Sequence, residues 1–124
     1  MITIVANLVA AGDRFSPEAF EKEFGIAFTR KNEPGSIAST GRYRGRAMPY
    51  GSGTLVDDWT GCDERSLLGS LVLRADVVAA CRRLGADSLT IHLDVEYDEQ
   101  CNFDFSEEVI GAIHSLGVPL TVSC

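Results

Sequence analysis

The residues best suited to chemistry stand in one alternating run. His92, Asp94 and Glu96 occupy every second position, and Asp98 continues the spacing. Because alternate side chains of a β-strand point to the same side, these groups are expected to form one polar row. Imidazole and carboxylate groups suit zinc, manganese or iron as ligands. Neighbours about 7 Å apart in a flat row do not converge on one ion, so we expect a binding surface with neither a metal ion nor another cofactor.

A second alternating set is basic. Arg42, Arg44 and Arg46 stand at every second position of a segment, 37–47, that we predict to be a strand. On a strand they would share one face, where guanidinium groups can hold a phosphate or a carboxylate. If this strand neighboured the acidic one, the two rows would instead meet as cross-strand ion pairs, each worth up to about 1 kcal/mol. The sequence leaves both alternatives open.

Other combinations offer weaker chemistry. Asp57 and Asp58 are adjacent, and neighbours on a strand point to opposite faces, so we do not expect them to act as an acid–base pair. The chain contains two histidines and four cysteines. No spacing joins a histidine to a thiol and an orienting carboxylate. No catalytic motif therefore marks the protein as an enzyme, and we favour a binding function.

Hydrophobic alternation and capping signals predict the elements that position these residues. Strands are expected at 2–8, just after 26–28, at 37–47 and 53–59 as a hairpin, at 89–97 and at 118–122. Helices are expected after the caps Ser16, Asp63 and Ser106, ending near Gly25, Gly85 and Gly117, and the middle one is interrupted at 74–76. The order predicts a single α+β domain over 1–124. Its antiparallel or mixed sheet of five to six strands has helices packed on one face, a layout related to the ferredoxin-like type.

Charge is distributed unevenly along the chain. The net charge is −7, from 11 basic and 18 acidic residues. Five of the basic residues lie within 30–46, whereas 84–124 contains no lysine or arginine. The acidic residues of that last stretch are Asp87, Asp94, Glu96, Asp98, Glu99, Asp104, Glu107 and Glu108. Such a surface repels phosphate, so we expect no nucleic acid partner and favour a basic protein.

The location of the protein is inferred from what the sequence contains. The 124 residues suit one domain. The apolar start has no lysine or arginine before Arg14, and no stretch approaches the roughly 20 apolar residues that span a bilayer. The four cysteines form no C-x-x-C pair and are expected to be reduced thiols. We therefore expect a soluble cytoplasmic protein with no membrane partner.

Three segments resemble a family of mostly bacterial proteins known as domain of unknown function 4279. They are the opening helix from Phe15-Ser16-Pro17-Glu18 to Phe24-Gly25-Ile26, Trp59 followed by Asp63-Glu64-Arg65-Ser66-Leu67-Leu68, and the closing helix from Phe105-Ser106-Glu107-Glu108 to Leu116-Gly117-Val118-Pro119-Leu120. The resemblance implies a small cytoplasmic α+β domain. It implies no reaction.

These observations lead to one functional prediction and two alternatives. The first is a non-enzymatic protein-binding module, such as an immunity or inhibitor protein that neutralises a basic toxin through its acidic surface. The second is a small ligand-binding or enzymatic domain that holds an anionic small molecule on the Arg42/Arg44/Arg46 face. The third is a structural homo-oligomer that uses the open sheet face or an edge strand.

Overall fold

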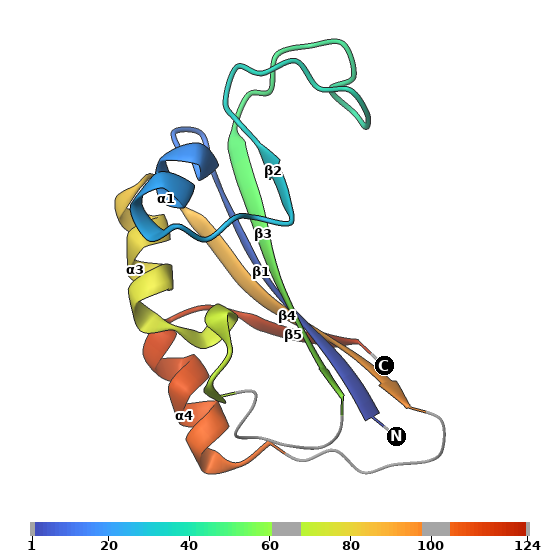
Figure 1. Ribbon diagram of the computed structural model, residues 1–124, viewed down its shortest axis with the longest axis vertical. Helices are drawn as coiled ribbons and strands as arrows, with labels where there is room; N and C mark the ends of the chain where they lie inside the picture. The colour runs from blue at the N-terminus through green and yellow to red at the C-terminus, as the bar shows by residue number, and fades with distance from the viewer. Residues whose placement is uncertain (1, 61–67, 98–104, 124) are drawn as a thin grey trace.

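The computed structural model describes residues 2–60, 68–97 and 105–123. These residues form one sheet with three α-helices on one side (Figure 1). The strands are β1 (Ile2–Gly12), β2 (Arg30–Asn32), β3 (Gly51–Thr60), β4 (Ser88–Tyr97) and β5 (Leu120–Ser123). The helices are α1 (Pro17–Phe24), α3 (Ala75–Arg83) and α4 (Glu107–Leu116), with a single 3₁₀ turn, η1 (Leu71–Leu73), before α3.

The sheet is mixed and has the strand order β2-β3-β1-β4-β5. Neighbouring strands are antiparallel except β4 and β5, which are parallel. The helices α1, α3 and α4 follow one another along one face (Figure 1). This arrangement confirms the predicted α+β class with helices on one face of a five-stranded sheet.

Period-two alternation in the central strands decides which side chains are buried. The residues of β1 and β4 that face the helices are exposed by less than a tenth: Ile4, Ala6, Leu8, Ala10, Leu89, Ile91, Leu93 and Val95. Their neighbours in sequence point to the opposite face, which no described helix covers. The sheet therefore has one apolar, buried face and one polar face in contact with water.

Helix α1 begins and ends where the sequence predicts. Ser16 caps it by accepting a hydrogen bond from Ala19 N, and Gly25 ends it in the left-handed conformation, with φ of 67°. The Phe20 ring is fully buried and packs 4.9 Å from the ring of Phe28, centroid to centroid. This contact holds α1 against the chain that leads into β2.

The segment 37–47 is not the predicted strand. It contains one isolated bridge, Ile37 to Ala47, and the chain turns back on itself between these residues. Gly41 and Gly45 have φ of 80° and 76°, a conformation that breaks strand alternation and that glycine adopts at low cost. The predicted hairpin with 53–59 is also wrong, because β3 pairs with β1 and β2. Residues 33–50, here called the arginine loop, project beyond the end of the sheet (Figure 1).

The predicted interruption of the middle helix is present at Arg74, which separates η1 from α3. The predicted start of this helix at 63–67 lies outside the described residues. Within the described part of the chain, no helix has the length and apolar composition needed to cross a membrane.

Candidate functional site

A polar cluster forms on the open face where β4 pairs with β5. The parallel register places His92 beside Thr121 and Asp94 beside Ser123. The Nδ1 atom of His92 contacts Thr121 Oγ1, and its Nε2 atom lies 2.9 Å from Asp94 Oδ1 and 3.2 Å from Ser123 Oγ. Asn7 of β1 adds a 3.4 Å bond from its amide to the carbonyl oxygen of His92. The imidazole ring is thus held by side chains of two strands.

The surroundings of this cluster favour recognition over catalysis. A hydroxyl, an imidazole and a carboxylate also form the triads of hydrolases, but there the carboxylate and the nucleophile use different ring nitrogens in a site with oxyanion donors. Here Asp94 and Ser123 share Nε2 and Thr121 contacts Nδ1. The Thr121 hydroxyl and the carboxylate thus use different nitrogens, but the cluster lies on an open face and not in a cleft. The side chains of His92 and Asp94 are 33% and 47% exposed, so water competes for each bond. Within residues 2–60, 68–97 and 105–123, no three His, Cys, Asp or Glu side chains are placed to hold a metal ion.

The acidic row continues along β4 toward the end of the strand. Glu96 pairs with Thr3 of β1 and is exposed. No lysine or arginine in the described segments forms an ion pair with Asp94 or Glu96. Asp98, the predicted fourth member, lies outside the described residues. The described row therefore presents two carboxylates without a lysine or arginine partner, and Asp94 contacts the imidazole of His92.

The three predicted arginines do not lie on the sheet. Arg42, Arg44 and Arg46 belong to the arginine loop and are exposed, and β4 has β1 and β5 as its neighbours. The alternative of cross-strand ion pairs required the basic and acidic rows to lie on neighbouring strands, and this condition is not met. The reason is that two glycines turn the chain before a strand can form, and that β1 takes the position next to β4.

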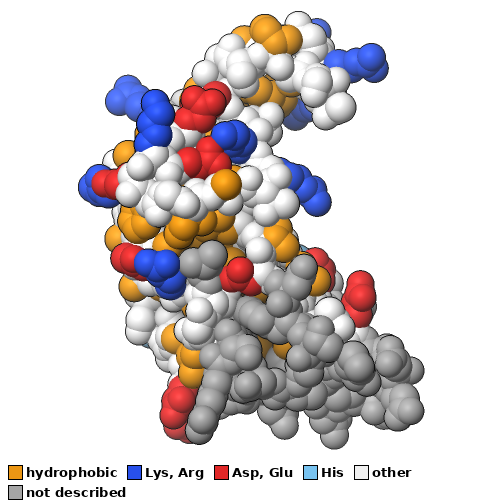
Figure 2. Space-filling model, in the orientation of Figure 1, with side chains coloured by type: hydrophobic (Ala, Val, Ile, Leu, Met, Phe, Trp, Pro, Cys, Tyr) orange, Lys and Arg blue, Asp and Glu red, His pale blue; other side chains and the backbone are white. Residues whose placement is uncertain are grey.

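Strand register gives the separation of the two charged regions. Across the sheet, Asp94 of β4 is level with Val5 of β1 and with the backbone of Asp58 of β3. Asp58 lies seven residues along β3 from Gly51, which directly follows the arginine loop. At about 3.3 Å per residue, the acidic row begins about 23 Å from the base of the arginine loop. This distance exceeds the Debye length of about 8 Å at physiological ionic strength. On the face shown in Figure 2, most of the visible lysine and arginine side chains lie in the half that carries the loop, so the two charged regions are screened from each other.

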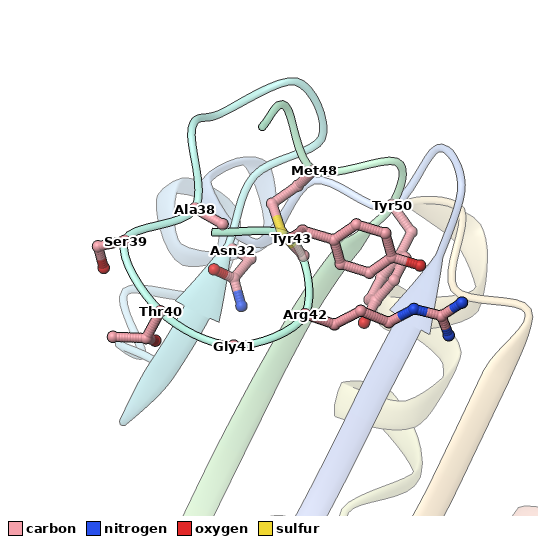
Figure 3. A pocket seen from close by; sticks show the side chains of 9 residues that line it. All are labelled: Asn32, Ala38, Ser39, Thr40, Gly41, Arg42, Tyr43, Met48 and Tyr50. Atoms are coloured by element: carbon pink, nitrogen blue, oxygen red, sulfur yellow. The ribbon is translucent and has the colours of Figure 1, made fainter. Parts of the chain in front are cut away.

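The arginine loop encloses a hollow of about 340 Å³. The chain curves around it, and the amide of Asn32 points inward (Figure 3). The Arg42 guanidinium lies 5.7 Å from the ring centre of Tyr43, and the Tyr43 and Tyr50 rings meet edge to face at 6.2 Å. The residues that line the hollow are Asn32, Ala38, Ser39, Thr40, Gly41, Arg42, Tyr43, Met48 and Tyr50. None of these side chains is a carboxylate.

Sequence reasoning missed several residues of these two regions. Thr121 and Ser123 alternate on a predicted strand, which was a usable signal, but their partner strand could not be read from local pattern. Tyr43 stands between two arginines and Tyr50 follows a proline. Their mutual contact depends on a loop that the sequence led us to predict as a strand.

Two weaker candidates from the sequence, Asp57 and Cys81, lie next to or within the buried core. Asp57 contacts the hydroxyl of the buried Ser70 near η1, while the side chain of Asp58 lies outside the described part. The thiol of Cys81 is fully buried in the core, and burial raises its pKa to about 11. A thiol in this setting stays protonated and is a poor nucleophile.

Comparison of the chain with protein-family models, curated proteins and solved structures found no match. The resemblance to domain of unknown function 4279 therefore stays a prediction from the sequence, and the functional argument rests on the geometry of this chain alone.

Proposed function

We propose that this chain is a non-enzymatic, cytoplasmic protein-binding module that takes up a basic protein partner on its open sheet face. The observation that carries the proposal is the acidic row of β4, whose carboxylates at Asp94 and Glu96 have no arginine or lysine partner among the described residues. The arginines that could have neutralised them lie about 23 Å or more away along the strands. An immunity or inhibitor protein is the concrete form of this role.

The size of the face supports this use. Strands β1, β3 and β4 have ten or eleven residues each, so they extend about 33 Å and together cover roughly 500 Å². A specific complex buries about 800 Å² on each partner, so this face alone would supply more than half of that area. Its centre carries Val5, Val9 and Val56 beside threonines, and Val9 is 38% exposed. A small apolar centre with acidic residues at one end is suited to steering and then packing a basic partner.

The experiment is capture from a lysate of the source cell at low salt, with the chain immobilised. The test variant combines Asp94→Asn and Glu96→Gln, and the control combines Glu107→Gln and Glu108→Gln, an equal change of charge on exposed α4. We expect one basic protein that is captured by the wild type and the control, lost from the test variant, and released as salt rises. Equal capture by all three proteins overturns the proposal. Sedimentation at twice the mass of the chain, with no captured partner, favours the homo-oligomer instead.

A further inference from the structure

We infer that the hollow of the arginine loop binds a small organic anion that carries a planar ring, with a nucleoside monophosphate as the simplest probe. This site is separate from the acidic row and independent of the proposed function. The inference rests on three properties of the hollow: a fixed wall, an unneutralised cation, and an aromatic side.

The wall is fixed by backbone hydrogen bonds and by anchoring to α1. Met48 N donates to Ser36 O at 2.7 Å, and Gly35 N donates to Met48 O at 2.8 Å, which closes the base of the loop. Ala38 N donates to Arg46 O at 3.0 Å further out. The side chains of Ala38 and Met48 are buried, with 8% and 7% exposure. A wall that already has its bound form costs little ordering free energy when a ligand enters.

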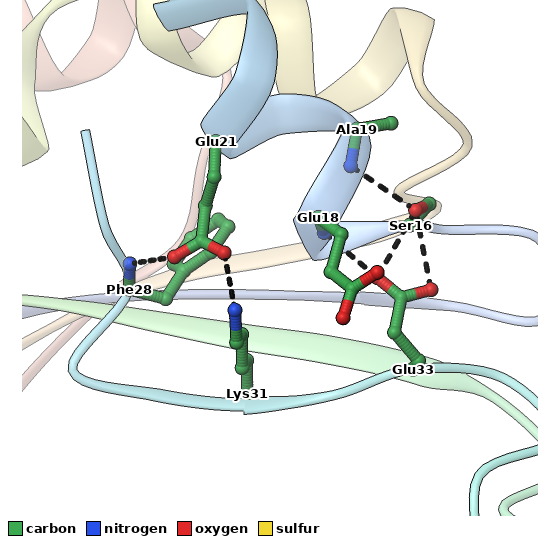
Figure 4. Close-up of polar contacts among 7 residues, drawn as sticks. All are labelled: Ser16, Glu18, Ala19, Glu21, Phe28, Lys31 and Glu33. Atoms are coloured by element: carbon green, nitrogen blue, oxygen red, sulfur yellow. Dashed lines mark hydrogen bonds and ion pairs between the residues drawn. The ribbon is translucent and has the colours of Figure 1, made fainter. Parts of the chain in front are cut away.

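Glu33 joins the base of this loop to the body of the protein. Its carboxylate accepts hydrogen bonds from Ser16 Oγ at 3.0 Å and from Glu18 N at 2.7 Å, at the N-terminus of α1 (Figure 4). Nearby, Glu21 accepts from Phe28 N at 2.9 Å and pairs with Lys31 of β2. Glu21 is therefore paired with a cation, whereas Glu33 keeps its charge but directs its carboxylate to α1 and does not line the hollow.

One basic side chain among the described residues lines the hollow, and its guanidinium lies on the tyrosine side, pointing away from the Asn32 amide (Figure 3). Arg42 lines it, Arg44 and Arg46 follow on the same loop, and none of the three forms an ion pair with a carboxylate in the described ranges. The Arg42 guanidinium lies 5.7 Å from the centre of the Tyr43 ring, where a cation–π contact favours this position. A guanidinium with no hydrogen-bond or ion-pair partner among residues 2–60, 68–97 and 105–123 is suited to bidentate binding of a phosphate or carboxylate.

The aromatic side of the hollow and its volume indicate the shape and size of the uncharged part of the ligand. Tyr43 and Tyr50 are half-buried and form one wall, against which a planar ring packs favourably. The Asn32 amide donates one hydrogen bond to Ser52 Oγ at 3.3 Å, and its second N–H and its oxygen can bond to a ring heteroatom. The 340 Å³ of the hollow lies at the small end of ligand sites, which span about 300–1,000 Å³. A small anion therefore fits better than a nucleic acid strand, which the acidic half would also repel.

The experiment is isothermal titration calorimetry of the full chain with adenosine monophosphate, adenosine, inorganic phosphate and benzoate. We expect adenosine monophosphate or benzoate to bind at least about tenfold more tightly than phosphate or adenosine, since only they combine a ring with an anion. Failure of both to bind, or phosphate binding as tightly as either, overturns the inference. Binding of an oligothymidylate without binding of the two organic anions also overturns it, in favour of a single-strand site.

Three variants test whether the organic anion binds in the hollow. Arg42→Gln is expected to weaken the organic anion about tenfold, and Arg42→Lys to weaken it less, because lysine keeps the charge but loses the planar fork. Arg14→Gln is the matched control, because Arg14 is exposed at the same end of the sheet but does not line the hollow. Circular dichroism and Tm verify that each variant folds. Equal loss of affinity in Arg14→Gln and Arg42→Gln would show that the effect comes from the overall electrostatic field of this end of the protein, and would refute the site. The Asp94→Asn/Glu96→Gln variant should bind the anion unchanged, which separates this test from that of partner capture.

Discussion

Replacing Glu33 with alanine tests how the arginine loop is attached to the rest of the molecule. The carboxylate of Glu33 accepts the hydroxyl of Ser16 and the N–H of Glu18, while Ser16 itself caps α1 through Ala19 N. A loop residue thus supplies the acidic group that helix N-termini favour. The substitution removes both hydrogen bonds and the negative charge at the helix end.

The expected loss follows from these two bonds. A hydrogen bond to a charged group contributes about 1.5–3 kcal/mol when water is excluded. Both bonds here are at least partly exposed, so about 0.5–1 kcal/mol each is the appropriate value. The interaction with the helix dipole adds about 0.3–1 kcal/mol. The free energy of unfolding should therefore fall by about 1.3–3 kcal/mol.

The assay is urea unfolding followed by circular dichroism. With a slope of about 1–3 kcal/mol per molar urea, the midpoint should fall by about 1 M. The matched control is Glu18→Ala, which removes a charge from the same helical turn but breaks no side-chain hydrogen bond in the described structure, and it should lose only about 0.3–1 kcal/mol. If the two variants unfold within about 0.3 kcal/mol of each other, the hydrogen bonds contribute nothing and the reasoning is refuted.

Three further predictions concern the body of the domain. Phe20→Ala should lower the unfolding free energy by about 3–5 kcal/mol, because the ring is fully buried against Phe28; a loss below about 1 kcal/mol in urea unfolding would contradict this packing. The Lys31 ammonium and the Phe28 N–H lower the pKa of Glu21, so its ionised form stabilises the fold above the ordinary pKa of 4.5, and this contribution is lost as pH falls. The stability advantage of the wild type over Glu21→Gln should therefore shrink between about pH 7 and pH 3, and an advantage that grows on acidification would refute it. Because burial raises the pKa of Cys81 to about 11, iodoacetamide at about pH 8 should modify it only in urea, as peptide mass spectrometry will show.

Local signals accounted for much of the fold. Ser16 and Pro17 start α1 and Gly25 ends it, because capping and left-handed geometry depend on the residues at those positions. The alternation from Leu89 to Tyr97 predicted both β4 and the row that holds His92, since a strand sends alternate residues to opposite faces. These features need no information from distant parts of the chain.

The arginine loop was misread because local pattern and conformation disagree there. Arg42, Arg44 and Arg46 alternate as on a strand, but strand preference is weak without a neighbouring strand to pack against. Gly41 and Gly45 on either side take positive φ and turn the chain. The same turn brings Tyr43 to Tyr50 and creates the hollow, so the candidate ligand site is a product of the misread segment.

The sequence by itself determined the composition of each region: an acidic row on a strand, a basic segment earlier in the chain, and the alternation that buries one face of the sheet. Only the tertiary structure decided which of them meet. Strand order is set by how all the apolar faces are buried together, and it places β1 and β5 beside β4. His92 therefore contacts Thr121, 29 residues away in sequence, while the arginines lie at the other end of the sheet, too far through salt solution to neutralise the acidic row.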